Sequence, residues 1–180
     1  TRAEVQLRLG RFQAGAEAFL QEMWLTPDYS RVRDASVAGI LAGNSGAART
    51  AALRLLEKSS STKDASEARW QLHVFTSLPG LVTKDNSPKL LELAKTAGGT
   101  WTEPMTAAVH YRLGDLAKAE PLLTTTRTEQ EFQALGAMLL YDRGEFDKAR
   151  KLLDVPTNWI KGERAKDPDS AIPIQQGWQN

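Results

Sequence analysis

The stretches YRLGDLAKAEPLL (111–123) and YDRGEFDKARKLL (141–153) repeat one pattern, and LRLGRFQAGAEAFL (7–20) is a third copy. In each copy a large residue stands three places before a glycine, and a charged and then a bulky apolar residue follow the glycine. A small residue stands five places after the glycine, and a large residue four places further on. In order along the pattern, the three copies hold Leu7, Tyr111 and Tyr141; Gly10, Gly114 and Gly144; Arg11, Asp115 and Glu145; Phe12, Leu116 and Phe146; Gly15, Ala119 and Ala149; Phe19, Leu123 and Leu153.

Each position of this pattern has a physical reason. Glycine adopts the left-handed conformation that ends a helix at little steric cost. An acidic residue after it suits the first turn of the next helix, near the positive end of the helix dipole. The small residue lets two helix backbones approach closely, and the large residue one turn later fills the space between them. The pattern therefore predicts the corner of a helix–turn–helix hairpin.

Weaker copies lie between the strong ones. ILAGNSGAARTAALRLLEK (40–58) keeps the glycine-to-small spacing at Gly46 and Ala51, and Gly80 falls in register in the next unit. After Gly80 a longer loop precedes Ser87, which we expect to be an N-cap with Pro88 at the first helical position. The corner glycines Gly10, Gly46, Gly80, Gly114 and Gly144 are 36, 34, 34 and 30 residues apart. A regular period of this size indicates stacked repeats.

The hydrophobic period and the positions of glycine and proline predict ten helices and no strand. They are expected near 1–9, 11–25, 31–42, 46–59, 64–78, 87–97, 102–113, 115–125, 128–143 and 145–154. Residues 1–154 would form the helical repeat domain, and Pro156 would break the last helix. Residues 155–180 would form a partly irregular cap or tail, in which Val155, Trp159 and Ile160 fold back over the end exposed after Leu153.

These hairpins resemble the tetratricopeptide repeat. The best matches are AAVHYRLGDLAKAEPLL (107–123) and AMLLYDRGEFDKARKLL (137–153), in which Ala107 and Ala137 stand seven places before the glycine. The early tryptophan of the family is not in register here, and the proline that closes each repeat is mostly absent. The resemblance implies an all-α fold, a right-handed superhelix of about five helix–turn–helix hairpins.

The same resemblance implies a site. The family binds an extended or helical peptide in the groove lined by the first helix of each pair. The groove residues implied here are Trp70, Val74, Trp101, Ala108, Tyr111, Arg112, Met138 and Tyr141, with Asp142 beside them. Because only Arg112 is basic in this set, clamping of a terminal carboxylate is disfavoured, and the expected partner is an apolar or amphipathic protein segment. The alternative is that Trp70 and Trp101 pack between neighbouring repeats.

Composition narrows the class of function. The chain has 23 Lys and Arg against 22 Asp and Glu, so it lacks the basic surplus typical of nucleic-acid binding. It has no cysteine, which excludes disulfides and thiol catalysis, and no apolar run that would insert into a membrane. The compartment stays open between cytoplasmic, periplasmic and extracellular. Because the first methionine is Met23, we expect a processed chain or a fragment.

Catalytic patterns are absent from the sequence. His73 and His110, the two histidines, lie in different repeats without metal-ligand spacing, and are expected to be structural and hydrogen-bonded. Glu120 with Arg127, and Asp147 with Lys151, are expected to be exposed charges. We therefore expect a non-enzymatic protein-binding module without cofactor or metal. A structural spacer, a self-associating domain and an accessory region of a larger enzyme remain alternatives, and RNA binding is disfavoured.

Overall fold

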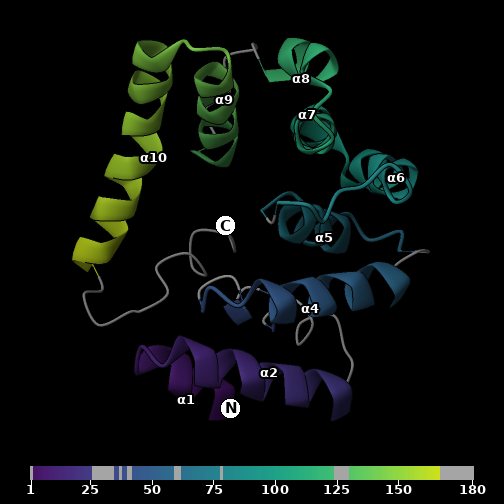
Figure 1. Cartoon of the computed structure of the whole chain (residues 1–180), viewed down its shortest axis with the longest axis vertical. Helices are drawn as coiled ribbons and strands as arrows, with labels where there is room; N and C mark the ends of the chain where they lie inside the picture. The colour runs from purple at the N-terminus through teal and green to yellow at the C-terminus, as the bar shows by residue number, and fades with distance from the viewer. Residues whose placement is uncertain are drawn as a thin grey trace. The chain divides into compact units, whose positions relative to one another are not determined.

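The computed structural model describes residues 2–25, 35–36, 38–39, 42–58, 62–77, 79–123 and 130–166, in which every regular element is a helix. The prediction of an all-α protein is therefore confirmed for these residues, and their helices lie close to the expected ranges except at the end of α10 (Figure 1). The elements are α1 (Arg2–Arg8), α2 (Phe12–Leu25), α4 (Ser45–Lys58), α5 (Ala65–Ser77), α6 (Ser87–Ala97), the 3-10 turn η1 (Gly99–Trp101), α7 (Thr102–Arg112), α8 (Leu116–Leu123), α9 (Gln130–Asp142) and α10 (Phe146–Lys166). No helix in the described ranges is both long and apolar enough to cross a membrane.

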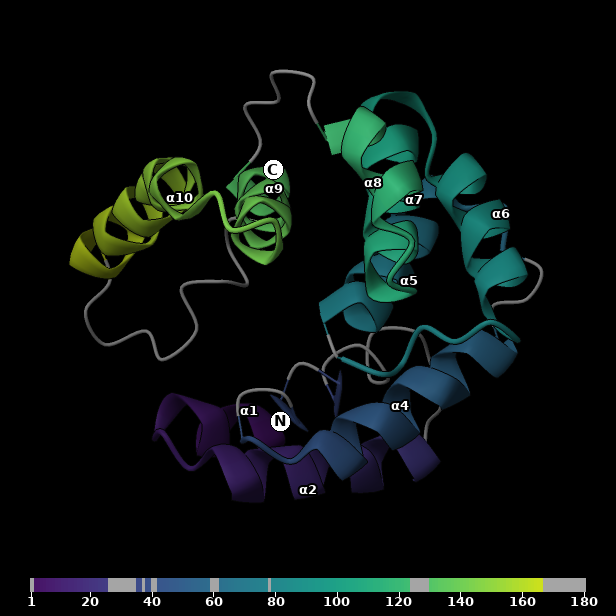
Figure 2. The same cartoon turned by 45° about the horizontal axis from the view of Figure 1, so that its top comes forward.

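The chain divides into two compact units, Thr1–Met105 and Thr106–Asn180, and the division falls inside α7. In the first unit α1 contacts α2, α2 contacts α4, α4 contacts α5, and α5 contacts α6. In the second unit α8 contacts α9, and α9 lies beside α10 (Figure 2). Helices that are close in the sequence are thus packed as neighbours within each unit, as hairpins require.

The three strong copies of the sequence pattern form the same backbone corner. Gly10, Gly114 and Gly144 have φ of 70°, 78° and 78°, in the left-handed region. Each glycine N–H donates to the carbonyl three residues earlier, and the next N–H donates to the carbonyl five residues earlier. These bonds are Gly10–Leu7, Arg11–Gln6, Gly114–Tyr111, Asp115–His110, Gly144–Tyr141 and Glu145–Leu140, each 2.9 Å long. This pair of bonds is the Schellman motif, which satisfies the last carbonyls of a helix.

The small residue of the pattern sits where the two helices of a hairpin meet. A Cβ atom added to Gly15 of α2 would lie 2.5 Å from Cδ2 of Leu7 in α1, so a larger residue there would require the Leu7 side chain to move. Ala119 and Ala149, at the same place in the other copies, are buried. The small residue is thus buried in all three copies, while its predicted role in the close approach of two helix backbones stays a prediction. The large residue is less uniform: Phe19 is 1% exposed as predicted, but Leu153 is 43% exposed, so its predicted filling role is wrong.

The second corner lies at Gly43 and not at Gly46. Gly43 has φ +65°, and the N–H of Asn44 donates to the carbonyl of Gly39 at 2.9 Å. The Oδ1 atom of Asn44 accepts the N–H of Ala47 at 3.0 Å and so caps α4, which contains Gly46. Asparagine is a strong N-cap, and its side chain rather than the second glycine decides where the helix begins.

The start of α6 also differs by one residue from the prediction. Asn86 is the N-cap residue, and Ser87, predicted as the cap, is the first residue of the helix. The side chain of Asn86 is used in the preceding loop, where Oδ1 accepts the N–H of Thr83 at 2.9 Å and Nδ2 donates to the carbonyl of Leu81 at 2.8 Å. Asn86 thus closes the loop, and the helix follows directly with Pro88 in its first turn.

The last helix is longer than predicted. α10 runs from Phe146 to Lys166 with Pro156 inside it, so Pro156 does not break the helix. A proline in a helix removes one backbone hydrogen bond, and here the residues that follow include lysine, arginine, glutamate and alanine, which favour helix. Val155 is exposed rather than covering the end of the hairpin. The side chains of Trp159 and Ile160 and residues 167–180 lie outside the described part, so the predicted cap and the boundary at 154 stay predictions.

The two units differ in the size of their buried side chains. The first unit buries large apolar residues, among them Phe19, Leu55, Leu72, Phe75, Leu81, Leu90 and Met105. In the described part of the second unit the buried apolar residues include Ala107, Ala108, Val109, Ala119, Ala137, Leu139 and Ala149, most of them alanine. Met138, Tyr141, Phe146 and Leu153 of the second unit are exposed, and they belong to the surface described next.

Candidate functional site

A hollow of about 490 Å³ lies within the second unit, mainly between α9 and α10. Tyr111 of α7 contributes to one side of it. The lining residues are Tyr111, Ala137, Met138, Tyr141, Asp142, Phe146, Ala149, Arg150 and Leu153. Its volume is within the range of about 300–1,000 Å³ that is usual for ligand pockets, and most of its lining is apolar or aromatic.

Helical spacing explains why these side chains meet. On α9, Met138, Tyr141 and Asp142 are three and four residues apart, so they share one face of the helix. On α10 the lining residues recur in the same way from Phe146 to Leu153. Between the two helices, the corner at Gly144 brings the rings of Tyr141 and Phe146 together edge to face, with centroids 5.1 Å apart. The hollow thus follows directly from the third copy of the sequence pattern.

The apolar lining is open to solvent. Tyr141 is 63% exposed, Phe146 is 55% exposed and Leu153 is 43% exposed. Single exposed apolar residues are ordinary on protein surfaces, but a contiguous group in a concave site indicates a place where another molecule binds.

The polar side of the hollow contains a strong hydrogen bond. The hydroxyl of Tyr111 donates to Oδ2 of Asp142 at 2.6 Å. Burial, followed by the hydrogen bond and the negative charge of Asp142, raises the pKa of Tyr111 to about 12. The Arg112 guanidinium lies 5.7 Å from the centre of the Tyr111 ring, and burial lowers the pKa of Arg112. The carboxylate of Asp142 is therefore engaged within the protein.

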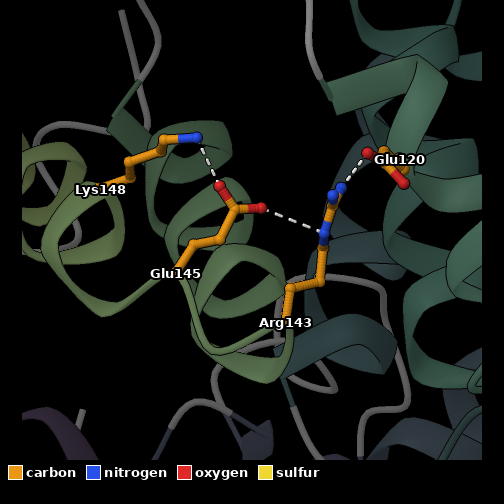
Figure 3. Close-up of polar contacts among 4 residues, drawn as sticks. All are labelled: Glu120, Arg143, Glu145 and Lys148. Carbon is orange, nitrogen blue, oxygen red and sulfur yellow. Dashed lines mark hydrogen bonds and ion pairs between the residues drawn. The ribbon is translucent and has the colours of Figure 1, made fainter.

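A network of charged side chains lies at the same corner (Figure 3). Arg143 pairs with Glu120 of α8, and its Nε atom lies 3.2 Å from Oε1 of Glu145. Lys148 Nζ lies 2.5 Å from the other carboxylate oxygen of Glu145, and this hydrogen bond is the main cause that lowers the pKa of Glu145. Glu120 was expected near Arg127, which lies outside the described residues. Exposed pairs of this kind contribute little to stability, because water and salt screen their charges.

The first unit holds a separate aromatic group around His73. The His73 ring meets the Trp101 ring edge to face at 5.5 Å and lies 6.2 Å from the Trp70 ring. Arg69 lies over Trp101, with its guanidinium carbon 5.3 Å from the ring centre, and donates to the carbonyl of Ala97 at 3.0 Å. Burial lowers the pKa of His73 to about 3, so the ring is neutral near pH 7. These contacts favour the packing interpretation of both tryptophans, while their role in binding stays a prediction.

The groove residues expected from the sequence therefore occupy different environments. Tyr111, Met138 and Tyr141 line the hollow together. Val74 and Ala108 are buried, so their side chains pack in the core and do not line a groove. Arg112 lies against Tyr111 without lining the hollow.

Three lining residues, Phe146, Arg150 and Leu153, were not predicted from the sequence to belong to a site. All three are on α10, the second helix of its hairpin, whereas the family resemblance placed the groove on first helices. Their spacing of four and three residues places them on one face of α10, and this pattern was the available signal.

The second histidine, His110, is mostly buried in α7. Its Nδ1 atom makes no hydrogen bond with the described residues and lies 3.9 Å from Oδ2 of Asp115. The hydrogen bond expected for it is thus not found at this atom. Within the described ranges, no group of three or more His, Cys, Asp or Glu residues is arranged to hold a metal ion.

Comparisons with protein-family models, with curated proteins and with solved structures find no match to this chain. The geometry above is therefore the basis for the function proposed below.

Proposed function

We propose that this chain is a non-enzymatic protein-interaction module that binds a segment of another protein in the hollow between α9 and α10. The observation that carries the proposal is the concave group of exposed apolar side chains, Met138, Tyr141, Phe146 and Leu153, beside Tyr111. Aromatic residues and methionine are enriched where proteins bind one another, and the rigid aromatic side chains bury a large apolar area at a small cost in side-chain entropy.

The proposal includes the tetratricopeptide-like architecture expected from the sequence, a right-handed superhelix of about five hairpins. Three Schellman corners in the same register and contacts between neighbouring helices support it. In such arrays each hairpin buries part of its apolar face against the next one. A hairpin with an uncovered apolar face is then suited to receive a helix or peptide from a partner.

A displayed library of helical peptides would test this function. We expect the full chain to enrich peptides with an apolar face, and Tyr141→Ala and Leu153→Ala to reduce that enrichment at least fivefold, as loss of about 1 kcal/mol or more at an interface anchor implies. Leu53→Ala is the matched control. The exposed fraction of Leu53, 41%, is similar to that of Leu153, but Leu53 lies on α4 in the first unit. Circular dichroism of each variant would show that the helices are retained.

Two results would contradict the proposal. One is enrichment of no peptide above the background of an unrelated helical protein. The other is equal loss in the Leu53→Ala control, which would place the binding outside the hollow. If no peptide is enriched but the chain forms dimers that Leu153→Ala disrupts, the self-association alternative replaces binding of a different protein.

A further inference from the structure

We propose that the occupant of the hollow is an amphipathic helix with a carboxylate on its flank, and that Arg150 recognises this carboxylate. The inference rests on the proposed function and adds the chemistry of the partner. It follows from three features of the site: its apolar floor, the few polar groups that are free to bind, and its charge.

The backbone requirements of the partner favour a helix over an extended strand. An extended segment needs hydrogen-bond partners for its own N–H and C=O groups when it leaves water. Few polar side chains line the hollow, and two of these, Tyr111 and Asp142, are already bonded to each other at 2.6 Å. A helix satisfies its backbone internally and needs only an apolar face to fill the hollow.

The charge of the site favours an acidic partner. Arg150 lines the hollow and is exposed, and it makes no hydrogen bond or ion pair with the described residues. The lining carboxylate, Asp142, is held by Tyr111. The part of α10 that lines the hollow, residues 146–154, has three basic residues, Lys148, Arg150 and Lys151, against the two acidic residues Asp147 and Asp154, so its surplus is one positive charge.

Binding of a partner would increase the energetic importance of the positive charge on Arg150. An apolar helix placed in the hollow would take water away from the guanidinium of Arg150, and an unpaired charge in such a place is costly. A carboxylate on the partner offsets the loss, because the planar guanidinium can donate two parallel hydrogen bonds to it. A partner with lysine at that place would instead add repulsion and would be excluded.

The test uses displayed helical peptides of about 18 residues, about five turns. All share one apolar face, and the flanking positions vary among Glu, Gln, Ser and Lys. The full chain and two variants, Arg150→Glu and Lys151→Glu, are used for selection. Both variants change the net charge equally at neighbouring positions of α10, but Lys151 does not line the hollow. Binding of the recovered Glu and Lys peptides is then compared by fluorescence anisotropy.

We expect the unaltered chain to prefer Glu over Lys flanks by about tenfold, since a hydrogen bond to a charged group contributes enough for that factor. The preference should vanish or reverse in Arg150→Glu and persist in Lys151→Glu. Selection of apolar peptides without preference for Glu would overturn this inference and leave the proposed function intact. Preference that survives Arg150→Glu, or falls equally in both variants, would also overturn it. Failure to select any peptide would contradict the proposed function itself.

Discussion

Alanine at Gly144 and alanine at Gly162 should change stability in opposite directions. A Cβ atom at either position meets nothing within 4 Å, so packing does not contribute to the difference. Gly144 has φ +78°, where an L-residue costs about 1–2 kcal/mol, partly offset by about 0.4–1 kcal/mol because alanine restricts the unfolded chain. Gly162 lies inside α10 with ordinary helical φ, where alanine is favoured by about 0.8–1 kcal/mol.

The free energy of unfolding should thus fall by about 1 kcal/mol in Gly144→Ala and rise by a similar amount in Gly162→Ala. Urea unfolding of the full chain, followed by helical circular dichroism, would measure both. With a urea dependence of about 1–3 kcal/mol per molar, each midpoint should move by roughly 0.3–1 M. A shift of both variants in the same direction, or no loss in Gly144→Ala, would refute the left-handed corner as the source of the cost.

Three further predictions follow from single contacts. Gly39→Ala should lower the free energy of unfolding by about 1–3 kcal/mol, because the added Cβ would lie 2.6 Å from the backbone N of Ala48; an unchanged urea midpoint would contradict that close approach. The pKa of Tyr111 is raised above that of the unfolded chain, so the stability it contributes is present below pH 10 and lost as pH rises toward 12; Tyr111→Phe, which also removes the bond to Asp142, should abolish this loss and the tyrosinate absorbance step near pH 12. The pKa of His73 is lowered, so its contribution is present above about pH 6.5 and lost as pH falls toward 3; in an NMR titration its ring should stay neutral at pH 5, and protonation near pH 6.5 would contradict its burial.

The hairpin corners could be predicted from the sequence because their causes are local. A Schellman motif needs one residue with positive φ and a few backbone bonds within six residues, and Gly114 and Gly144 supply the first requirement directly. The same reasoning failed where the sequence offers two solutions. In GNSG (43–46) the side chain of Asn44 caps α4, and this places the corner at Gly43. A rule based only on the spacing of glycines does not include this side-chain hydrogen bond.

The candidate site was only half predictable for a different reason. Tyr141 was assigned to the groove because the family resemblance points to first helices, and it does line the hollow. Phe146 and Arg150, on the second helix, carry equally regular spacing, but spacing gives the face of a helix and not what covers it. The exposure of that face depends on residues far away in the sequence, which periodicity cannot report.

Phe19 and Leu153 make this distinction clear, since they hold the same place in two copies of one pattern. Both follow a left-handed glycine by nine residues and a small, buried residue by four. Phe19 is nevertheless buried, in a unit where α2 contacts both α1 and α4. Among the described helices, α9 is the one that packs extensively against α10. The local pattern thus determines how a hairpin turns, and its neighbours determine whether its apolar face becomes core or surface. Where described neighbours leave that face open, as at Leu153, the residue chemistry of a core is available for binding another molecule, and this is the physical basis of the function proposed for the hollow.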